Sequence, residues 1–396
     1  MYDVIVAGGG PVGSRAAYRL AQKGRRVLVL EKKSEPGTKV ICTGIIGQEC
    51  AAAFNIDDRA IIRKVNSASL FSPSGNRLHI RREETQACIL DRTVFDVSMA
   101  EQAQRAGAEY RFKSRVIDIN VNNDIVSVAT DYQGKTQVIT AKAVIIACGF
   151  NPGLLKRLGL GVFRDITIGV QAEVEAPDTD EVEVYFGDAT PGFFAWLVPT
   201  ALPVAKAGLL SRENAGLYLK KWLAALVERG KIASAEVKIN YGGIPLKPLS
   251  RTCSERMVVV GDAAGQVKPT SGGGIYYGLL SADIAADVLH QALEDDDLSE
   301  RRLRRYERGW RKKLGREIRT GYWFRKLYER LSNRQIDRIF EIIKAGGIDE
   351  TLLKADDLAF DWHGRAILRL LKYQMVAKTI GRIKLPFRTD RIDPER

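Results

Sequence analysis

The 396 residues are 45% apolar and 28% charged, an ordinary balance for a soluble globular protein with a well-buried core. No uninterrupted run of about 18 apolar residues occurs, and Met1 leads directly into a strand-like run, so we expect neither a membrane-spanning helix nor a leader. The five cysteines contain no CxxC pair and the three histidines lie far apart. This pattern argues against disulfides, iron–sulfur clusters and metal sites, and it favours a cytoplasmic location.

The excess positive charge lies entirely in the last quarter of the chain. Residues 301–396 hold 26 Lys and Arg against 13 Asp and Glu; since the chain totals are 61 and 48, the first 300 residues hold 35 of each. Such a region suits an anionic membrane face or an acidic electron-donor protein, and the alternative is a solvated helical face. No zinc, helix-turn-helix or RNP motif supports nucleic-acid binding, so none is expected.

In chain order, the patterns predict an α/β protein that begins with a strand, a tight turn and a helix. The predicted strands are Tyr2–Ala7, Val27–Leu30, Val116–Ile119, Ile125–Ala129, Ala143–Ala147, Glu181–Phe186, Phe193–Val198 and Met257–Val260. Helices are predicted over Glu101–Gly107 and Ser281–Leu293, and the chain after Ser299 is expected to be helical and basic.

The glycines of Gly8-x-Gly10-x-x-Gly13 lie between the first strand and the first helix. Gly8 permits the tight turn, Gly10 lets the backbone approach a pyrophosphate at the helix N-terminus, and Gly13 lets helix and strand pack closely. Glu31 ends the second strand, 18 residues after Gly13, where its carboxylate can accept a hydrogen bond from a ribose 2′-hydroxyl and would repel a 2′-phosphate. These residues predict a dinucleotide site of the FAD or NAD type.

A second strand-to-turn element favours FAD. Val258–Gly265 carries Asp262 at the carboxyl end of a strand, where ligands of open α/β sheets lie, and an extended flavin would present its ribityl hydroxyls to this carboxylate. Gly272, Gly273 and Gly274 then lead into a helix, so the backbone can lie against a flat ring with the helix N-terminus at its pyrimidine edge.

These motifs resemble those of the geranylgeranyl reductase family, within the para-hydroxybenzoate hydroxylase class of glutathione-reductase-type flavoproteins. The resemblance covers roughly residues 1–293. Leu90–Asp96 is similar to the family's DRxxFD segment, whose arginine, here Arg92, lies near the flavin. Lys39–Gly44 resembles the family's cysteine–glycine loop beside the isoalloxazine, with Thr43 where glycine is usual. Phe194–Pro199 is similar to the aromatic-x-Trp-x-x-Pro signature, and Gly261–Ile275 is the closest match.

The resemblance implies an FAD-dependent reductase that saturates carbon–carbon double bonds of an isoprenoid, geranylgeranyl-type chain on a lipid, quinone or related substrate. Hydride from the reduced flavin and a proton for the remaining carbon are required, with NAD(P)H or reduced ferredoxin as external reductant. Cys42 is the candidate catalytic proton donor, and the alternative is a small buried residue. The residues predicted to line a substrate channel, with ordinary core packing as the alternative, are Tyr185, Phe193, Phe194, Trp196 and Pro199.

The predicted fold is a Rossmann-type FAD-binding domain with an inserted mixed-sheet substrate domain and a helical C-terminal region. The FAD-binding domain comprises residues 1–65, 90–160 and 244–295, the substrate domain 66–89 and 161–243, and the C-terminal region 296–396. The predicted cofactor-binding residues are Gly8, Gly10, Pro11, Gly13, Glu31, Lys32, Cys42, Gly44, Arg92, Val116, Cys148, Gly149, Gly261, Asp262, Gly272, Gly273, Gly274 and Ile275.

Two C-terminal segments carry apolar faces with basic flanks. They are the sets Phe324, Leu327, Tyr328, Leu331 and Ile367, Leu370, Leu371, Met375. Such faces suit helices lying on the inner face of the cell membrane, and the alternative is packing on the protein. Functional alternatives are an FAD-dependent monooxygenase of an apolar substrate and a flavoprotein electron carrier. A halogenase is disfavoured because its Trp-x-Trp-x-Ile motif is absent.

Overall fold

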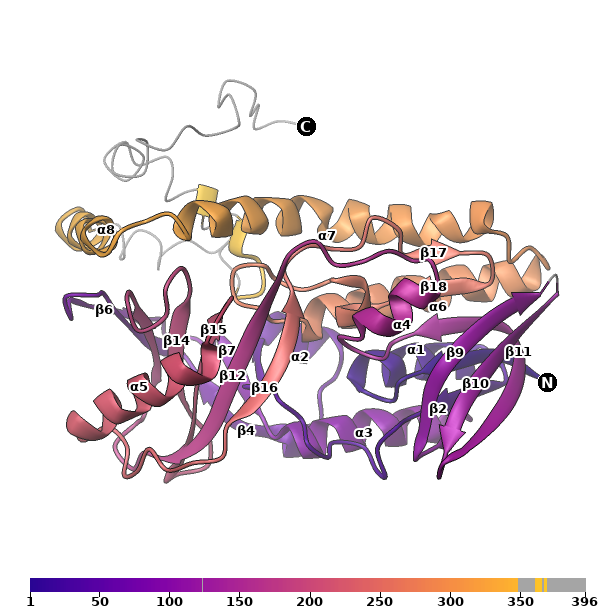
Figure 1. Cartoon of the computed structure of the whole chain (residues 1–396), viewed down its shortest axis with the longest axis horizontal. Coiled ribbons are helices and arrows are strands. Elements are labelled where there is room, and N and C mark those ends of the chain that lie inside the picture. The colour runs from indigo at the N-terminus through magenta and orange to yellow at the C-terminus, as the bar shows by residue number, and fades with distance from the viewer. Residues whose placement is uncertain (123, 348–359, 365–366, 369–396) are drawn as a thin grey trace, which may run out of the picture.

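The computed structural model describes residues 1–122, 124–347, 360–364 and 367–368 (Figure 1). An N-terminal α/β body and a second body built on a mixed sheet lie side by side, and helix α7 (Glu300–Tyr328) runs along both. The predicted α/β class, with a Rossmann-type first body, a second sheet and a helical C-terminal part, is confirmed.

The first body is built on an eight-stranded sheet whose central strands are parallel. Val4–Ala7 of β1 (Tyr2–Ala7) are fully buried, as expected for a strand covered on both faces. In spatial order the sheet contains β17 (Cys253–Ser254), β18 (Met257–Val259), β11 (Lys135–Ile146), β1, β2 (Val27–Leu30) and β8 (Glu109–Arg111). Strand β10 (Ile125–Tyr132) also pairs with β11, and β9 (Ser114–Asn122) pairs with β10.

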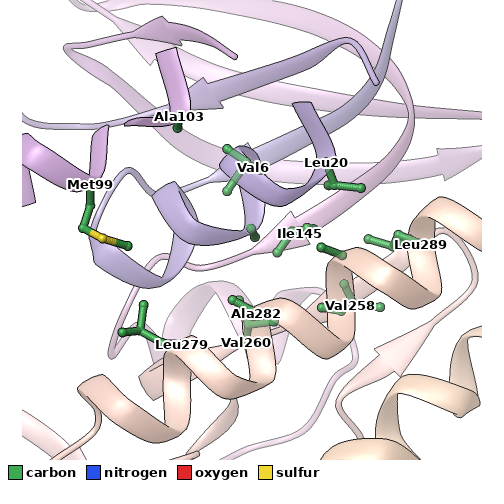
Figure 2. Packing of buried hydrophobic residues seen from close by; sticks show 14 of the residues in the cluster. Val6, Leu20, Met99, Ala103, Ile145, Val258, Val260, Leu279, Ala282 and Leu289 are labelled. Atoms are coloured by element: carbon green, nitrogen blue, oxygen red, sulfur yellow. The ribbon is translucent and has the colours of Figure 1, made fainter. Parts of the chain in front are cut away.

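Helices α1 (Pro11–Ala21), α3 (Arg92–Arg105) and α6 (Ile275–Glu294) contribute to one core with this sheet. Figure 2 shows Val6 and Ile145 of the sheet facing Leu20 of α1 and Leu279 and Leu289 of α6. The predicted helix Ser281–Leu293 lies within α6, and the predicted helix Glu101–Gly107 overlaps the last residues of α3, which ends at Arg105. The start of α3 is fixed by the Asp91 carboxylate, which accepts hydrogen bonds from the N–H groups of Thr93 and Val94.

The second body is a seven-stranded sheet covered on one face by α5 (Ala215–Glu228). Its strands, in spatial order, are β16 (Asn240–Pro245), β12 (Ile166–Glu175), β15 (Val204–Ser211), β14 (Phe194–Pro199), β13 (Val182–Phe186), β5 (Ser67–Phe71) and β6 (Arg77–Arg81). Leu219, Trp222 and Leu223 of α5 pack on that face. A three-stranded sheet that the sequence patterns did not predict contains β3 (Ile45–Gly47), β7 (Ala87–Leu90) and β4 (Ile61–Val65). The short helices are α2 (Gln48–Ala53) and α4 (Pro152–Arg157).

The C-terminal helices pack on both bodies. Helix α7 buries Tyr306, Trp310 and Leu314, which share one core with α6, and α8 (Asn333–Ala345) places Ile336 and Phe340 against Leu78 of β6. Within the described part of the chain, no helix combines the length and apolarity that crossing a membrane requires.

One of the two apolar faces considered for membrane contact packs on the protein instead. Leu327 is buried, the Tyr328 hydroxyl donates to the Phe193 carbonyl oxygen at 2.9 Å, and Leu331 packs beside Leu78. The alternative of protein packing therefore holds for this face. In the second set Ile367 is buried, and Leu370, Leu371 and Met375 lie outside the described residues.

Candidate active site

The glycine turn between β1 and α1 has the geometry that its three glycines predict. Gly8 has φ +114°, and a Cβ there would lie 2.5 Å from the Ala147 carbonyl oxygen. A Cβ on Gly13 would lie 2.0 Å from the Gly8 carbonyl oxygen, so this glycine is required for packing. At Gly10 a Cβ would meet nothing within 4 Å, because this position opens on a cavity at the helix N-terminus. An anionic pyrophosphate fits that space.

Glu31 lies beside this turn, at the end of β2. Its Oε2 accepts a hydrogen bond from the Gly9 N–H at 2.7 Å, and its Oε1 accepts one from the Lys33 N–H at 2.9 Å. The carboxylate is therefore fixed against the turn. Glu31 is buried, with 7% of its surface exposed. Its remaining lone pairs suit the ribose hydroxyls of an adenosine.

Asp262 follows β18 and lies beside the glycine loop that opens α6. A Cβ on Gly274 would be 2.2 Å from Asp262 Oδ1, so only glycine allows the loop to approach this carboxylate. Within the described residues its side chain makes no hydrogen bond, and burial raises its pKa to about 6 although the Arg92 charge opposes the rise. A partly buried carboxylate that accepts no hydrogen bond within the described residues and borders a cavity fits a polyhydroxyl chain such as ribityl.

The loop that carries Cys42 is held from both bodies. Lys206 Nζ of β15 donates to the Cys42 carbonyl oxygen at 3.2 Å, and Gln171 of β12 accepts from the Thr43 hydroxyl at 2.8 Å. Arg92 of α3 pairs with Asp96 at 2.8 Å and also interacts with the Cys42 sulfur. Burial lowers the pKa of Arg92, but its interactions with Cys42 and Asp96 raise it by more. The thiol thus borders a permanent cation.

These groups surround one cavity of about 810 Å³. This volume is within the range typical of small-molecule sites. Of the residues predicted to bind the cofactor, Gly13 alone does not line the cavity, since it is packed beneath the turn. The others all do: Gly8, Gly10, Pro11, Glu31, Lys32, Cys42, Gly44, Arg92, Val116, Cys148, Gly149, Gly261, Asp262, Gly272, Gly273, Gly274 and Ile275.

An apolar wall forms the other end of the cavity. It consists of alternate residues of two paired strands, together with side chains of α7. The wall residues are Val182, Val184 and Phe186 of β13, Phe194, Trp196 and Val198 of β14, and Phe324 and Tyr328 of α7. Because strand side chains alternate between faces, one face of this strand pair lines the cavity. Phe194 and Trp196, both predicted to line a substrate channel, are among the residues that line this cavity.

Three predicted channel residues do not line this cavity. Tyr185 points to the opposite face of β13, where it stacks on Phe71 at 4.7 Å between ring centroids and packs against Trp222 under α5. Phe193 precedes β14 and is buried beneath the Arg325 guanidinium, 3.3 Å from its ring centroid. Pro199 ends β14 beyond the wall. For Tyr185 the face assignment was wrong, because aromatic spacing alone does not show which face a strand buries.

Sequence reasoning also missed a cluster from distant parts of the chain. Lys268, Thr270, Phe360, Asp361 and His363 line the cavity. Lys268 Nζ lies 2.7 Å from Asp361 Oδ1, and both side chains are buried. The run Phe360–His363, which places aromatic and ionisable residues together inside the basic region, was the available signal. The described residues contain no group of three or more His, Cys, Asp or Glu side chains arranged to hold a metal ion.

The fold and this cavity define a Rossmann-type FAD-dependent oxidoreductase. Residues 2–179 match the pyridine nucleotide-disulphide oxidoreductase family model. The chain is 31% identical over 388 residues to digeranylgeranylglycerophospholipid reductase of Methanococcus aeolicus, covering 94% of this chain and 97% of the relative. It is also 31% identical to the enzyme of that name from Methanocaldococcus jannaschii, covering 88% and 93%. The chain therefore belongs to the digeranylgeranylglycerophospholipid reductase family.

Solved structures share the fold of this chain. A geranylgeranyl bacteriochlorophyll reductase-like protein from Thermoplasma acidophilum superposes with a TM-score of 0.85 at 25% identity, covering 96% of this chain and 98% of that one. A p-nitrophenol 4-monooxygenase from Pseudomonas putida superposes with a TM-score of 0.70 at 16% identity, covering 97% and 99%, and this likeness shows the fold alone.

Proposed function

We propose that this protein saturates isoprenoid double bonds of geranylgeranyl-type chains carried on a lipid. The observation that supports this most is the cavity itself, in which a cradle suited to FAD and an aromatic, apolar wall face the same space. The named relatives act on lipids whose chains are of this type. We further propose the predicted division into an FAD-binding domain, a substrate domain on the seven-stranded sheet and a C-terminal region.

The roles of the residues follow from their positions. Glu31 would hold the adenosine ribose and Asp262 the ribityl chain, and the apolar wall with Trp196 would hold the isoprenoid and exclude water. Bound FAD would supply the hydride. Cys42 would give a proton to the second carbon of the double bond, the one that does not receive the hydride. Its loop is fixed by Lys206, which donates to the Cys42 carbonyl oxygen, and by Gln171, which accepts from the Thr43 hydroxyl.

The test is an anaerobic single-turnover experiment. The flavoprotein is reduced with dithionite and mixed with a geranylgeranylated lipid, and flavin absorbance and product mass are followed. Reoxidation without air, with a gain of two hydrogens per reduced bond, is the expected result. Reoxidation only after air is admitted, with an oxygenated product, would instead support the monooxygenase alternative. Reoxidation by a protein or quinone acceptor alone would support an electron carrier.

The reductant and the partner surface are part of this proposal. Along α7, Arg305, Arg308, Lys312, Arg316 and Arg319 are exposed on one face and make no ion pair within the described residues. We propose that this face contacts an anionic membrane surface, where lipid substrates are found. The proposed external reductant is NAD(P)H or a reduced ferredoxin. An acidic ferredoxin-like donor protein would also fit the basic face of α7.

Vesicle sedimentation tests the membrane contact. Binding to phosphatidylglycerol vesicles, with loss at high salt, is expected, and the charge reversal Arg308→Glu with Lys312→Glu should abolish it. Equal sedimentation with phosphatidylcholine and phosphatidylglycerol would contradict it. Stopped-flow reduction of the flavin by NADH, by NADPH or by reduced ferredoxin then identifies the donor.

A further inference from the structure

A buried ion pair joins the distant segment Phe360–Gly364 to the glycine loop. The Lys268 and Asp361 side chains are 7% and 2% exposed, and their charged atoms lie 2.7 Å apart. Asp361 Oδ2 also accepts the Gly47 N–H at 3.0 Å, and the Asp361 carbonyl oxygen accepts the Tyr277 hydroxyl at 3.2 Å. Asp361 is thus held through its carboxylate by Lys268 and Gly47, and through its carbonyl oxygen by Tyr277.

The Lys268 ammonium lies directly against the loop that opens α6. A Cβ on Gly273 would be 2.9 Å from Lys268 Cε and 3.5 Å from Nζ. The Lys268 N–H donates to the Gly273 carbonyl oxygen at 2.9 Å, and the Gly272 N–H donates to the Lys268 carbonyl oxygen at 2.8 Å. The backbone of this loop and the charge of the pair therefore occupy one place on the cavity wall.

The neighbouring histidine adds no charge to this place. His363 Nε2 lies 2.9 Å from the Phe360 carbonyl oxygen, which can only accept, so Nε2 carries the proton. When the ring is neutral, Nδ1 accepts a hydrogen bond from the Thr270 hydroxyl. Burial and the Lys268 charge lower the pKa of His363 to about 3, in agreement with this assignment. Other charged groups near the loop and the Phe360–Gly364 segment are Asp262 beside Gly274, Arg92 beyond it, Glu49, which accepts from the Tyr276 hydroxyl, and Glu317, which accepts from the Gly364 N–H.

Stability does not explain why charges occupy this site. The desolvation of two buried charges offsets most of their attraction, and a packed apolar pair of similar volume is often as stable or more so. A fixed charge pair beside a redox cofactor has another effect, because its field acts on any charge the cofactor gains.

We propose that Lys268 and Asp361 are positioning residues that set the reduction potential of the bound flavin. They hold the glycine loop in place, and each compensates the charge of the other beside the cofactor. This inference rests on the proposed placement of FAD along this loop, and not on which substrate is reduced. Reduction adds negative charge to the cofactor. An uncompensated ammonium therefore favours the reduced state, and an uncompensated carboxylate disfavours it.

Potentials of the purified holoproteins test the proposal, measured by anaerobic equilibration with a reference dye of known potential. Asp361→Asn should raise the potential and Lys268→Met should lower it, each by about tenfold in the equilibrium constant, or about 30 mV for a two-electron couple. The double variant should return close to the parent value, and Lys268→Arg should stay there. Flavin content and thermal unfolding are recorded for each protein.

An ion pair away from the cavity provides the control. Arg15 of α1 lies 2.6 Å from Asp283 of α6, and neither residue lines the cavity. Arg15→Met and Asp283→Asn should leave the potential unchanged. The proposal would be overturned if Asp361→Asn and Lys268→Met shifted the reduction potential in the same direction, or if the double variant did not return to the parent value. Damage to the structure, unlike the loss of one charge, would not shift the potential in opposite directions in the two variants. Loss of flavin from all variants, Lys268→Arg included, would also overturn it. A protein with these shifts but no alkene reduction would refute the proposed function alone.

Discussion

The two ends of the cavity are built from different parts of the chain. At the end beneath α1 and α6, turns and glycine loops present backbone groups, and a few fixed carboxylates such as Glu31 and Asp262 complete the lining. At the end beneath β13 and β14, side chains from one face of a strand pair and from α7 form the wall. The lining of the first end is determined by the conformations that the backbone can adopt. The lining of the second end is determined by the face of the strand pair on which each side chain lies.

This difference determines how each end should respond to substitution. At the backbone-built end, Gly8 and Gly13 should tolerate no added methyl group, since a Cβ there would lie 2.5 Å and 2.0 Å from carbonyl oxygens. A side-chain-built wall should lose contact area gradually as its members are truncated, with the fold retained. The predictions below test this contrast, beginning where the two ends meet.

Cys42 lies at the meeting point, and its replacement should give the largest effect. Cys42→Ala is expected to lower the rate of alkene reduction by about a hundredfold or more, the usual contribution of a general acid, while flavin content stays unchanged. Rapid-quench measurement of product per turnover checks this. Cys253→Ala, at a buried cysteine away from the cavity, is the control and should leave the rate unchanged. A Cys42→Ala protein with the parental rate would exclude the proton-donor role.

Gly10 and Gly13 separate binding from folding within the flavin end. Gly10→Ala adds a methyl group to open space in the cavity, so the apoprotein should melt normally. FAD binding should weaken by about tenfold to a hundredfold, the equivalent of a clash costing about 1–3 kcal/mol. Gly13→Ala should lower both stability and FAD binding, because its Cβ would lie 2.0 Å from a carbonyl oxygen. Differential scanning calorimetry of apoproteins and flavin titration measure both, and equal melting of the two variants would contradict the contrast.

The same contrast explains how much could be predicted from the sequence. The positions of Gly8, Glu31 and Asp262 beside the cavity could be predicted because glycine turns at the ends of parallel strands depend on local geometry that residue identity specifies. Their contacts with FAD stay a prediction. The wall was found only in part. Phe194 and Trp196 line the cavity, and their contact with a substrate stays a prediction. The face of Tyr185 depends on pairing with β14 and on α5, which packs on the other side. Lys268 and Asp361 lie 93 residues apart, so no local pattern predicts their contact. The exact domain boundaries stay a prediction.

Trp196 and Tyr185 test the two faces of one strand pair. Trp196→Ala should raise KM and lower kcat/KM by about tenfold, through lost contact with an apolar chain, while the flavin spectrum stays unchanged. Tyr185→Leu is the matched control from the opposite face. It should lower the free energy of unfolding by about 1–3 kcal/mol without changing KM, because its stacking on Phe71 and contact with Trp222 are lost. If KM changed in Tyr185→Leu but not in Trp196→Ala, the substrate would lie on the Tyr185 face of the sheet, which would contradict the proposed channel.

The smallest expected effect concerns the pH dependence of the apoprotein. Because burial raises the pKa of Asp262 from its usual value near 4 to about 6, the folded apoprotein binds this proton more tightly than the unfolded chain does. Its contribution to stability is therefore fully present below about pH 4 and is lost as the pH rises through about 6. Relative to Asp262→Asn, which cannot ionise, the wild-type apoprotein should lose about 1–2 kcal/mol of unfolding free energy across this window.

Urea unfolding of both apoproteins at several pH values measures this difference. Asp165 serves as a control of opposite sign. Burial alone would raise its pKa, but hydrogen bonds from Arg212, Lys326 and Tyr322 lower it to about 2. Its contribution is present above about pH 4 and is lost as the pH falls toward about 2, outside the window of Asp262. A wild-type curve parallel to that of Asp262→Asn between pH 4 and 6 would mean that water in the cavity already solvates the Asp262 carboxylate. The flavin end would then be less dry than its backbone-built lining implies.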